Sequence, residues 1–377
     1  MSDHSGFDVA VVGGGLVGTA LAYELVLAGA GVILVDRHDP GRATDAGAGI
    51  LSPESVSTED SNWFALAMGA GEHYRNLVPT LEADGARATG YAVTGLLRVG
   101  FREWEDDLFA TNLALAQARC ADEVEEITPT EARRRFPPLG EIRNAWYSAR
   151  AARVDGRAMT AALLDAAVAA GVTVVHGSVH DMEIEAGRVT AAVWEGGPIA
   201  CDAVVIAGGA WTPALAEQFG VSIPVTPVRG QIVHLRLDGV GTSDWPIVSP
   251  LLSQYLVPFP DGRVVVGATL EPDAGFDARP TAAGMRQLFS EMLRLAPGLA
   301  EATFLEVRAG LRPVSVDDSP VLGRLPGWVN AYVCTGHGAN GLLLGPYSAH
   351  LVATLVRGGA PAMDLAPFRP ERFASTP

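Results

Sequence analysis

Short apolar runs and glycines alternate at the start of the chain. Residues 7–12 form an apolar run of strand length, residues 16–28 have the length and composition of a helix, and residues 32–35 form a second apolar run rich in β-branched side chains. Three glycines separate the first run from the helix, and Asp36 follows the second run. The pattern predicts a β-turn-α-β unit.

The rest of the chain alternates between two kinds of pattern, with a break expected near residues 79–90. Further helices are predicted at 103–120, 128–135, 156–170, 281–295 and 340–357, and further strands at 91–100, 172–176, 180–185, 188–195, 203–206, 303–311, 332–335 and within 225–269. Nucleotide-type patterns fall in residues 1–85, 150–225 and 310–377, and antiparallel patterns fall in 86–149 and 226–309. We therefore expect a mixed α/β protein, with a Rossmann-like domain and an inserted domain built on a mixed antiparallel sheet.

Length and charge exclude several classes of function. The chain has 377 residues, which makes two domains the default. Its net charge of −16 should repel phosphate backbones, so no nucleic-acid partner is expected. All 27 basic residues are arginine. The absence of lysine excludes Schiff-base enzymes, among them those that use pyridoxal phosphate, and any nucleotide site built on a P-loop lysine.

The cysteines and the longest apolar stretch indicate in which cellular compartment the protein is expected. Cys120, Cys201 and Cys334 are odd in number and far apart, which fits neither a disulfide framework nor the spacing of zinc or iron–sulfur ligands. We expect no metal and a reducing, cytoplasmic location. Glycines interrupt the apolar stretch 9–35, and no basic segment precedes it, so neither a membrane span nor a signal peptide is expected.

Residues 13–18, Gly-Gly-Gly-Leu-Val-Gly, fit the GxGxxG fingerprint of dinucleotide-binding folds. In such a motif Gly13 makes the tight turn, Gly15 lets the backbone approach a pyrophosphate, and Gly18 lets the helix pack closely on the strand. A predicted strand precedes the motif, a predicted helix follows it, and Asp36 ends the second strand where an acid binds ribose. Together these features predict a dinucleotide site.

Several further short motifs occur in a fixed order along the chain: residues 46–51 (Ala-Gly-Ala-Gly-Ile-Leu), 153–156 (Arg-Val-Asp-Gly), 204–211, 227–231 (Pro-Val-Arg-Gly-Gln), 310–313 (Gly-Leu-Arg-Pro) and 335–338 (Thr-Gly-His-Gly). With the fingerprint, they make the chain resemble the D-amino acid oxidase family of FAD-dependent oxidoreductases, in its glycine oxidase and sarcosine oxidase branch. The resemblance covers nearly the whole length. It implies that the three-segment domain binds FAD and that the inserted domain binds the substrate.

The resemblance also implies roles for individual residues at the cofactor. The pyrophosphate would lie at Gly13, Gly15 and Gly18, the ribose at Asp36, and adenine at the backbone of Val179. The isoalloxazine would lie against Ala48 and Gly49 and before the helix that starts near Asn340. The expected cofactor set is completed by Arg37, Thr44, Gly208, Trp211, Gly338, Gly341 and Leu342. No cysteine or histidine stands where relatives attach flavin, so the FAD is expected to be non-covalent.

For the substrate, the resemblance points to an amine-bearing carboxylate. Arg312 would bind the carboxylate with its guanidinium fork, although a buried arginine paired with Asp317 or Asp318 is the structural alternative. Tyr255 would help to bind the same group. Arg308, four positions from Arg312 on one strand face, would be a second polar ligand or a surface ion pair.

The pocket wall is expected to differ from that of the glycine oxidases. His337 would pack at the flavin, Leu270 would form an apolar wall, and Ala339 stands where the glycine oxidase pattern has arginine. A missing arginine opens the pocket. This difference predicts a preference for bulky or N-substituted amino acids over glycine.

The implied reaction is hydride transfer from the substrate Cα to the flavin, which gives an imine that water hydrolyses. Oxygen or another acceptor would take the electrons. One alternative is the catalytic subunit of a heteromeric amine or imino-acid dehydrogenase that passes electrons to a partner. A flavin monooxygenase is disfavoured because no Gly-Asp motif precedes the last helix. A non-catalytic FAD module is the remaining alternative. The sequence does not determine the oligomeric state, and a homo-oligomer is possible.

Overall fold

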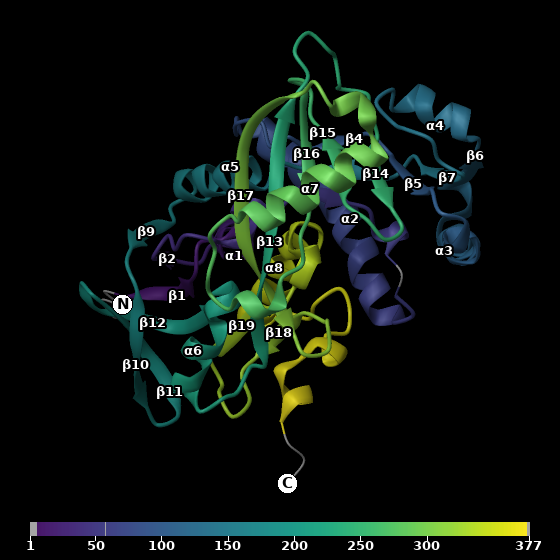
Figure 1. The fold of residues 1–377 in the computed structure, drawn as a ribbon. Helices are drawn as coiled ribbons and strands as arrows, with labels where there is room; N and C mark the ends of the chain where they lie inside the picture. Colours follow the sequence, from purple (N-terminus) through teal and green to yellow (C-terminus); the bar gives the residue numbers. More distant parts are fainter. Residues whose placement is uncertain (1–5, 57, 375–377) are drawn as a thin grey trace.

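The computed structural model describes residues 6–56 and 58–374, which form two large sheets and a small one (Figure 1). The first sheet has the strand order β10-β11-β12-β1-β2-β9, with β19 beside β12 and β18 beside β19. Its strands are β1 (Phe7–Val12), β2 (Val32–Asp36), β9 (Thr173–His176), β10 (Val179–Glu185), β11 (Arg188–Trp194), β12 (Gly197–Ile206), β18 (Val321–Arg324) and β19 (Ala331–Thr335). Strands β9, β2, β1, β12 and β19 run parallel, so their carboxyl ends meet at one edge.

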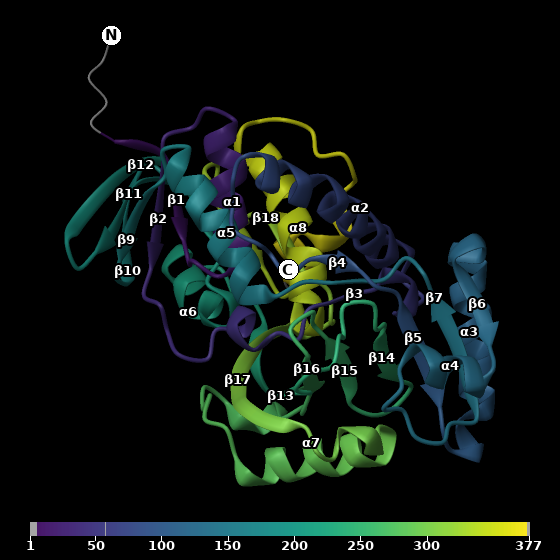
Figure 2. The ribbon, with the colours of Figure 1, turned by 90° about the horizontal axis from the view of Figure 1, so that it is seen from above.

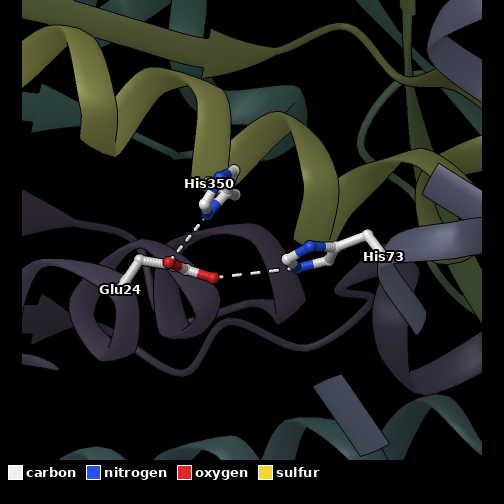
Figure 3. A group of neighbouring side chains, drawn as sticks. All are labelled: Glu24, His73 and His350. Atoms are coloured by element: carbon white, nitrogen blue, oxygen red, sulfur yellow. Dashed lines mark hydrogen bonds and ion pairs between the residues drawn. The ribbon is translucent and has the colours of Figure 1, made fainter. Parts of the chain in front are cut away.

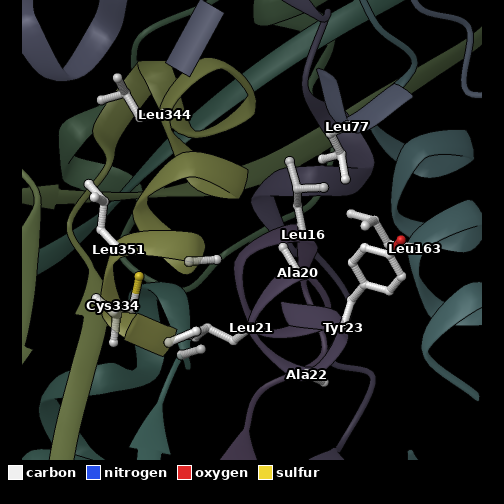
Figure 4. Packing of buried hydrophobic residues seen from close by; sticks show 14 of the residues in the cluster. Leu16, Ala20, Leu21, Ala22, Tyr23, Leu77, Leu163, Cys334, Leu344 and Leu351 are labelled. Atoms are coloured by element: carbon white, nitrogen blue, oxygen red, sulfur yellow. The ribbon is translucent and has the colours of Figure 1, made fainter. Parts of the chain in front are cut away.

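Four helices pack as a layer on one face of the parallel sheet. They are α1 (Leu16–Leu27), α2 (Ser61–Ala83), α5 (Gly156–Ala169) and α8 (Gly341–Val356). Leu16 and Leu21 of α1 lie between side chains of its neighbours, among them Leu77, Leu163 and Leu351 (Figure 4). Strand residues alternate between the two faces, so Val9 and Val11 join this cluster whereas Ala10 and Val12 join a second cluster with β10, β11 and α6 (Thr212–Ala216). Burial on both faces fixes the position of β1.

The second sheet has the order β17-β13-β16-β15-β14-β5-β7-β6 and is antiparallel except between β14 and β5. Its strands are β5 (Leu96–Gly100), β6 (Val124–Ile127), β7 (Asn144–Ser148), β13 (Val225–Arg236), β14 (Ile247–Pro250), β15 (Tyr255–Pro258), β16 (Arg263–Gly267) and β17 (Thr303–Ser315). Helices α7 (Ala282–Leu295) and α4 (Pro129–Arg135) pack on one face, and Figure 2 shows α7 on the side away from the first sheet. The other face packs on α3 (Asp106–Cys120) and on Ala48 and Ile50, and the rest of that face is available to line a site.

A small sheet joins the two large ones. It contains β3 (Ile50–Leu51), β8 (Ala152–Arg153) and β4 (Ala92–Val93), with β8 in the middle. None of the helices in the described part of the chain is both long and apolar enough to cross a membrane.

The mixed α/β architecture and the first β-turn-α-β unit are confirmed, and the division at the predicted domain boundaries stays a prediction. Helix α2 was not predicted: Pro79 lies inside it, and the chain breaks only after Ala83. The buried face of α2, which packs on α8, outweighs the cost of an internal proline. Strand β17 runs on to Ser315, which places Arg312 inside a strand, and β18 was also missed.

Candidate functional site

A cavity of about 760 Å³ lies where the carboxyl ends of the parallel strands meet the free face of the second sheet. The residues that follow β1, β2, β12 and β19 line it from one side, and Arg98, Ser249, Tyr255 and Arg312 line it from the other. Its volume falls within the range of cofactor and ligand sites. The cavity is therefore the candidate active site.

The glycine motif between β1 and α1 divides into residues that shape the turn and residues that face the cavity. Gly13 has φ of +108°, and a Cβ there would lie 2.5 Å from the carbonyl oxygen of Ala207. A Cβ on Gly18 would overlap the carbonyl oxygen of Gly13, whereas one on Gly15 would meet only Thr44 Oγ1, at 3.5 Å. Gly15 thus lies against open cavity, and Gly18 is required for the packing of α1 on the turn.

Asp36 closes the turn from the end of β2. Its carboxylate accepts hydrogen bonds from the backbone N–H of Gly14 at 2.9 Å and from Nη1 of Arg42 at 2.8 Å. Thr44 Oγ1 accepts from the N–H of Leu16 at 3.1 Å, at the first turn of α1. These bonds occupy the N–H groups of Gly14 and Leu16, while residues 15–17 at the N-terminus of α1 line the cavity, so the positive end of the helix faces it, which is an arrangement that binds phosphate.

The opposite wall of the cavity is built so that two side chains can lie flat on the sheet. The Arg312 guanidinium occupies the space that a Cβ on Gly230 would need, and Nη1 donates to the carbonyl oxygen of Thr269 at 3.1 Å. The Tyr255 ring lies over Gly267, where a Cβ would come within 2.6 Å of it. Two glycines of neighbouring strands thus make room for the two polar groups.

The charge states at this end of the cavity follow from burial. Burial raises the pKa of Tyr255, against the opposing effect of the Arg312 guanidinium, so the phenol stays protonated at neutral pH. Burial lowers the pKa of His337 to about 4, and its Nε2 is buried without a hydrogen-bond partner. Arg312 has no carboxylate partner among the residues that the structure describes, and Asp317 pairs instead with Arg372 at 2.7 Å. The structural alternative for Arg312, a pair with Asp317 or Asp318, is not found.

Most of the residues proposed from the sequence line the cavity. The cofactor candidates that do so are Gly13, Gly15, Asp36, Arg37, Thr44, Ala48, Gly49, Val179, Gly208, Trp211, Gly338, Asn340, Gly341 and Leu342. Gly18 lies outside the lining, in its packing position. Tyr255 and Arg312 line the cavity as well, and their roles stay predictions.

Two expected residues are placed elsewhere. Arg308 is outside the cavity lining and pairs with Glu306, which is the surface ion pair that the sequence offered as an alternative. Leu270 is 72% exposed, so it forms no pocket wall. Strand β16 ends at Gly267, but the chain stays hydrogen-bonded to β13 through Glu271, and the Leu270 side chain is turned to solvent. We therefore do not assign either residue to the site.

Sequence reasoning missed Arg98 and Ser249, which lie on the free face of the second sheet and line the cavity. Arg98 Nη1 donates to Ser249 Oγ at 2.7 Å. A signal existed, because Arg98 interrupts the apolar run of Leu96, Leu97 and Val99 within a strand. The roles of Gly230 and Gly267 were also missed, since they depend on contacts between strands.

A second polar cluster lies apart from the cavity (Figure 3). Glu24 of α1 accepts from His350 of α8 at 2.9 Å and lies 3.7 Å from His73 of α2. The three ligand atoms lie within 4.8 Å of one another. The hydrogen bond with Glu24 raises the pKa of His350, and burial lowers that of His73 to about 4. This cluster links three helices, and the expectation of no metal stays a prediction.

Known proteins share this architecture. The family model described as DAO, FAD dependent oxidoreductase, matches residues 8–355. The glycine oxidase of Pseudomonas putida is 32% identical over 368 residues, covering 96% of this chain and 98% of that protein. The crystal structure of iminodiacetate oxidase from Chelativorans sp. BNC1 is 36% identical with a TM-score of 0.91 and covers 96% of this chain and 98% of that one. The crystal structure of glycine oxidase from Geobacillus kaustophilus is 32% identical with a TM-score of 0.89 and covers 96% and 98%.

Proposed function

Because this chain belongs to the DAO family of FAD-dependent oxidoreductases, we propose that it oxidises an amine-bearing carboxylate, either an amino acid or an N-substituted amino acid. FAD is the cofactor of the family. The names of two relatives, glycine oxidase and iminodiacetate oxidase, refer to substrates of this kind. The observation that carries the proposal is the Arg312 guanidinium, which lies in the cavity with no carboxylate partner among the described residues.

The residues present fit the dinucleotide cofactor. Backbone donors at the start of α1 lie on the cavity beside Gly15 and would hold the pyrophosphate. The carboxylate of Asp36, at the end of β2, would hold the adenosine ribose. The first turn of α8 follows Asn340 and also lines the cavity, so its positive end would face the flavin ring. When bound, FAD supplies the acceptor for the hydride that leaves the substrate Cα.

The chain's own part in the reaction is to hold the substrate. Arg312 offers a planar pair of N–H donors that matches a carboxylate, and the protonated Tyr255 hydroxyl donates a further hydrogen bond. Two contacts on one carboxylate would fix the position and plane of that group and so limit the positions that the neighbouring Cα–H bond can take. Loss of hydride and of the amine proton leaves a C=N bond, and water then converts the imine into a carbonyl compound and an amine.

Turnover of matched substrate pairs tests the proposal. At least one member of a panel of glycine, sarcosine, iminodiacetate, D-amino acids and cyclic imino acids should give a carbonyl product, trapped as a hydrazone, faster than the corresponding amine without a carboxylate. Assays in air and with an added dye separate oxygen from another electron acceptor. Equal rates for the acids and the bare amines would contradict the proposal.

We expect the cofactor to be held without a covalent bond, because no cysteine or histidine of the chain stands beside residues 46–51. Acid precipitation of the yellow protein should release the flavin into the supernatant, at about one FAD per chain. Colour retained in the washed pellet would contradict this expectation.

Asp36→Ala should weaken FAD binding by about tenfold or more, because charge-assisted hydrogen bonds contribute about 1.5–3 kcal/mol. Titration of the apoprotein with FAD measures the change. Asp8→Ala is the control, since Asp8 lies on the neighbouring strand β1 outside the cavity lining and accepts a hydrogen bond from the backbone N–H of Gly31 at 2.6 Å. An FAD affinity that is equal in the two variants would remove Asp36 from the proposed ribose site.

A further inference from the structure

A row of residues crosses four strands on the face of the second sheet that lines the cavity. Arg98 of β5 is in register with Ser249 of β14. The pairing of Val248 with Leu256 places Ser249 opposite Tyr255 of β15, and Tyr255 is in register with Gly267 of β16. Residues in register share a face, so Arg98 and Tyr255 belong to the same wall of the cavity.

Arg98 has no counter-charge in the described part of the chain. Its Nη1 donates to Ser249, and its Nε is buried without a hydrogen-bond partner. Burial lowers its pKa to about 10, so the guanidinium remains charged at neutral pH. A buried cation without an anion is costly, and a bound anion would offset the cost.

No acidic side chain among the residues that the structure describes takes that position. Glu54, which is buried near the same region, accepts hydrogen bonds from Ser52 and Ser148 rather than from Arg98. Asp36, the last residue of β2, and Asp39 are the acids in the cavity lining, and both lie at the carboxyl edge of the first sheet. Because Arg98 lines the cavity, an anionic group of a bound ligand could take that position.

The two arginines lean toward each other across the sheet. Arg98 reaches from β5 to Ser249 on β14, and Arg312 reaches from β17 to a position over Gly230 on β13. β13 and β14 are three strand spacings apart, and Gly230 lies two residues along β13 from Ile232, which is paired with Gly267 of the row, so the two guanidinium positions are about 16 Å apart. Four bonds between two carboxyl carbons span about 5 Å, and a hydrogen-bonded guanidinium adds about 4 Å at each end. A bound dicarboxylate would thus span about 13 Å, and the two long arginine side chains would have to move closer by about 3 Å in total.

We propose that the substrate carries two carboxylates, and that Arg312 binds the one on the oxidised carbon while Arg98 binds the second. This inference rests on the proposed function, because it assigns the first carboxylate to Arg312. The second carboxylate can lie on the nitrogen substituent, as in iminodiacetate, or on the side chain, as in aspartate and glutamate. The common chemistry is an amino dicarboxylate.

Replacement of Arg98 tests the assignment. Arg98→Met should lower kcat/KM for iminodiacetate by about 100-fold and for sarcosine by less than about threefold, because sarcosine has no second carboxylate. Arg98→Lys should restore part of the loss. Arg286→Met is the control, since Arg286 is exposed on α7, on the other side of the sheet. Aspartate and glutamate in the same series show which position of the second carboxylate the site accepts.

A binding measurement separates this inference from the proposed function. Diglycolate and methoxyacetate contain no amine and differ by one carboxylate. Each is titrated into the FAD-bound protein and followed by the change in the flavin absorption spectrum. Diglycolate should bind at least tenfold more tightly, and Arg98→Met should abolish the difference. If diglycolate binds more tightly as predicted but no amino acid is oxidised, the proposed function is wrong and the second carboxylate site is still supported. Equal affinities in the unchanged protein, or equal losses for iminodiacetate and sarcosine in Arg98→Met, would overturn the inference.

Discussion

Arg312→Met is expected to lower kcat/KM for carboxylated amines by about two to three orders of magnitude. The variant removes both donors from the fork that we propose to bind the carboxylate, and loss of one partner of such a pair costs about 2–5 kcal/mol. Amines without a carboxylate should be oxidised as slowly by the variant as by the unchanged protein. The effect should therefore depend on the substrate.

Arg308→Met is the matched control for that experiment. Arg308 lies on the same strand, outside the cavity lining, and is paired with Glu306. We expect its substitution to change kcat/KM by less than about threefold. If Arg312→Met slowed acids and bare amines equally, or if Arg308→Met had the larger effect, the carboxylate would have to bind elsewhere.

Gly18→Ala should be the most damaging single change in the nucleotide region. The added methyl group would overlap the carbonyl oxygen of Gly13, and neither backbone can move without separating α1 from β1. We expect a loss of about 3 kcal/mol or more, seen as a lower melting temperature, together with loss of bound FAD.

Gly15→Ala tests whether the glycine motif affects FAD binding independently of the packing of α1. Gly15 has φ of −71°, and a Cβ there meets only Thr44 Oγ1 at 3.5 Å, so the apoprotein should keep its melting temperature. FAD affinity should nevertheless fall, because the methyl group points into the space where the pyrophosphate is proposed to bind. Equal melting temperatures for apo Gly15→Ala and apo Gly18→Ala would contradict this division of roles.

Local pattern was sufficient to predict the nucleotide-binding unit. The strand, the three glycines, the helix and Asp36 lie within 30 residues, and their geometry depends on backbone conformation and close packing. Helix α2 was missed because Pro79 signals a break, and only its contacts with α8 show why the helix continues through the proline.

The substrate end of the cavity was harder to predict because it depends on pairing between distant strands. Arg98 and Ser249 are separated by 151 positions, and nothing in either local sequence predicts their contact. Alternation along β17 does place Arg308 and Arg312 on one face, but it cannot show that the cavity reaches only one of them. Leu270 was expected in the pocket from family resemblance and proved to be exposed.

Anaerobic reduction of the flavin shows whether this chain oxidises amine-bearing carboxylates. The yellow protein is mixed without oxygen with sarcosine, iminodiacetate or a D-amino acid, and in parallel with the corresponding amine that lacks a carboxylate. We predict that at least one carboxylated amine reduces the flavin and bleaches its yellow colour, at a rate that saturates with the concentration of that amine. The colour should persist with the bare amines. A flavin that stays oxidised with every carboxylated amine, while dithionite bleaches it normally, would contradict the claim that this chain oxidises amine-bearing carboxylates.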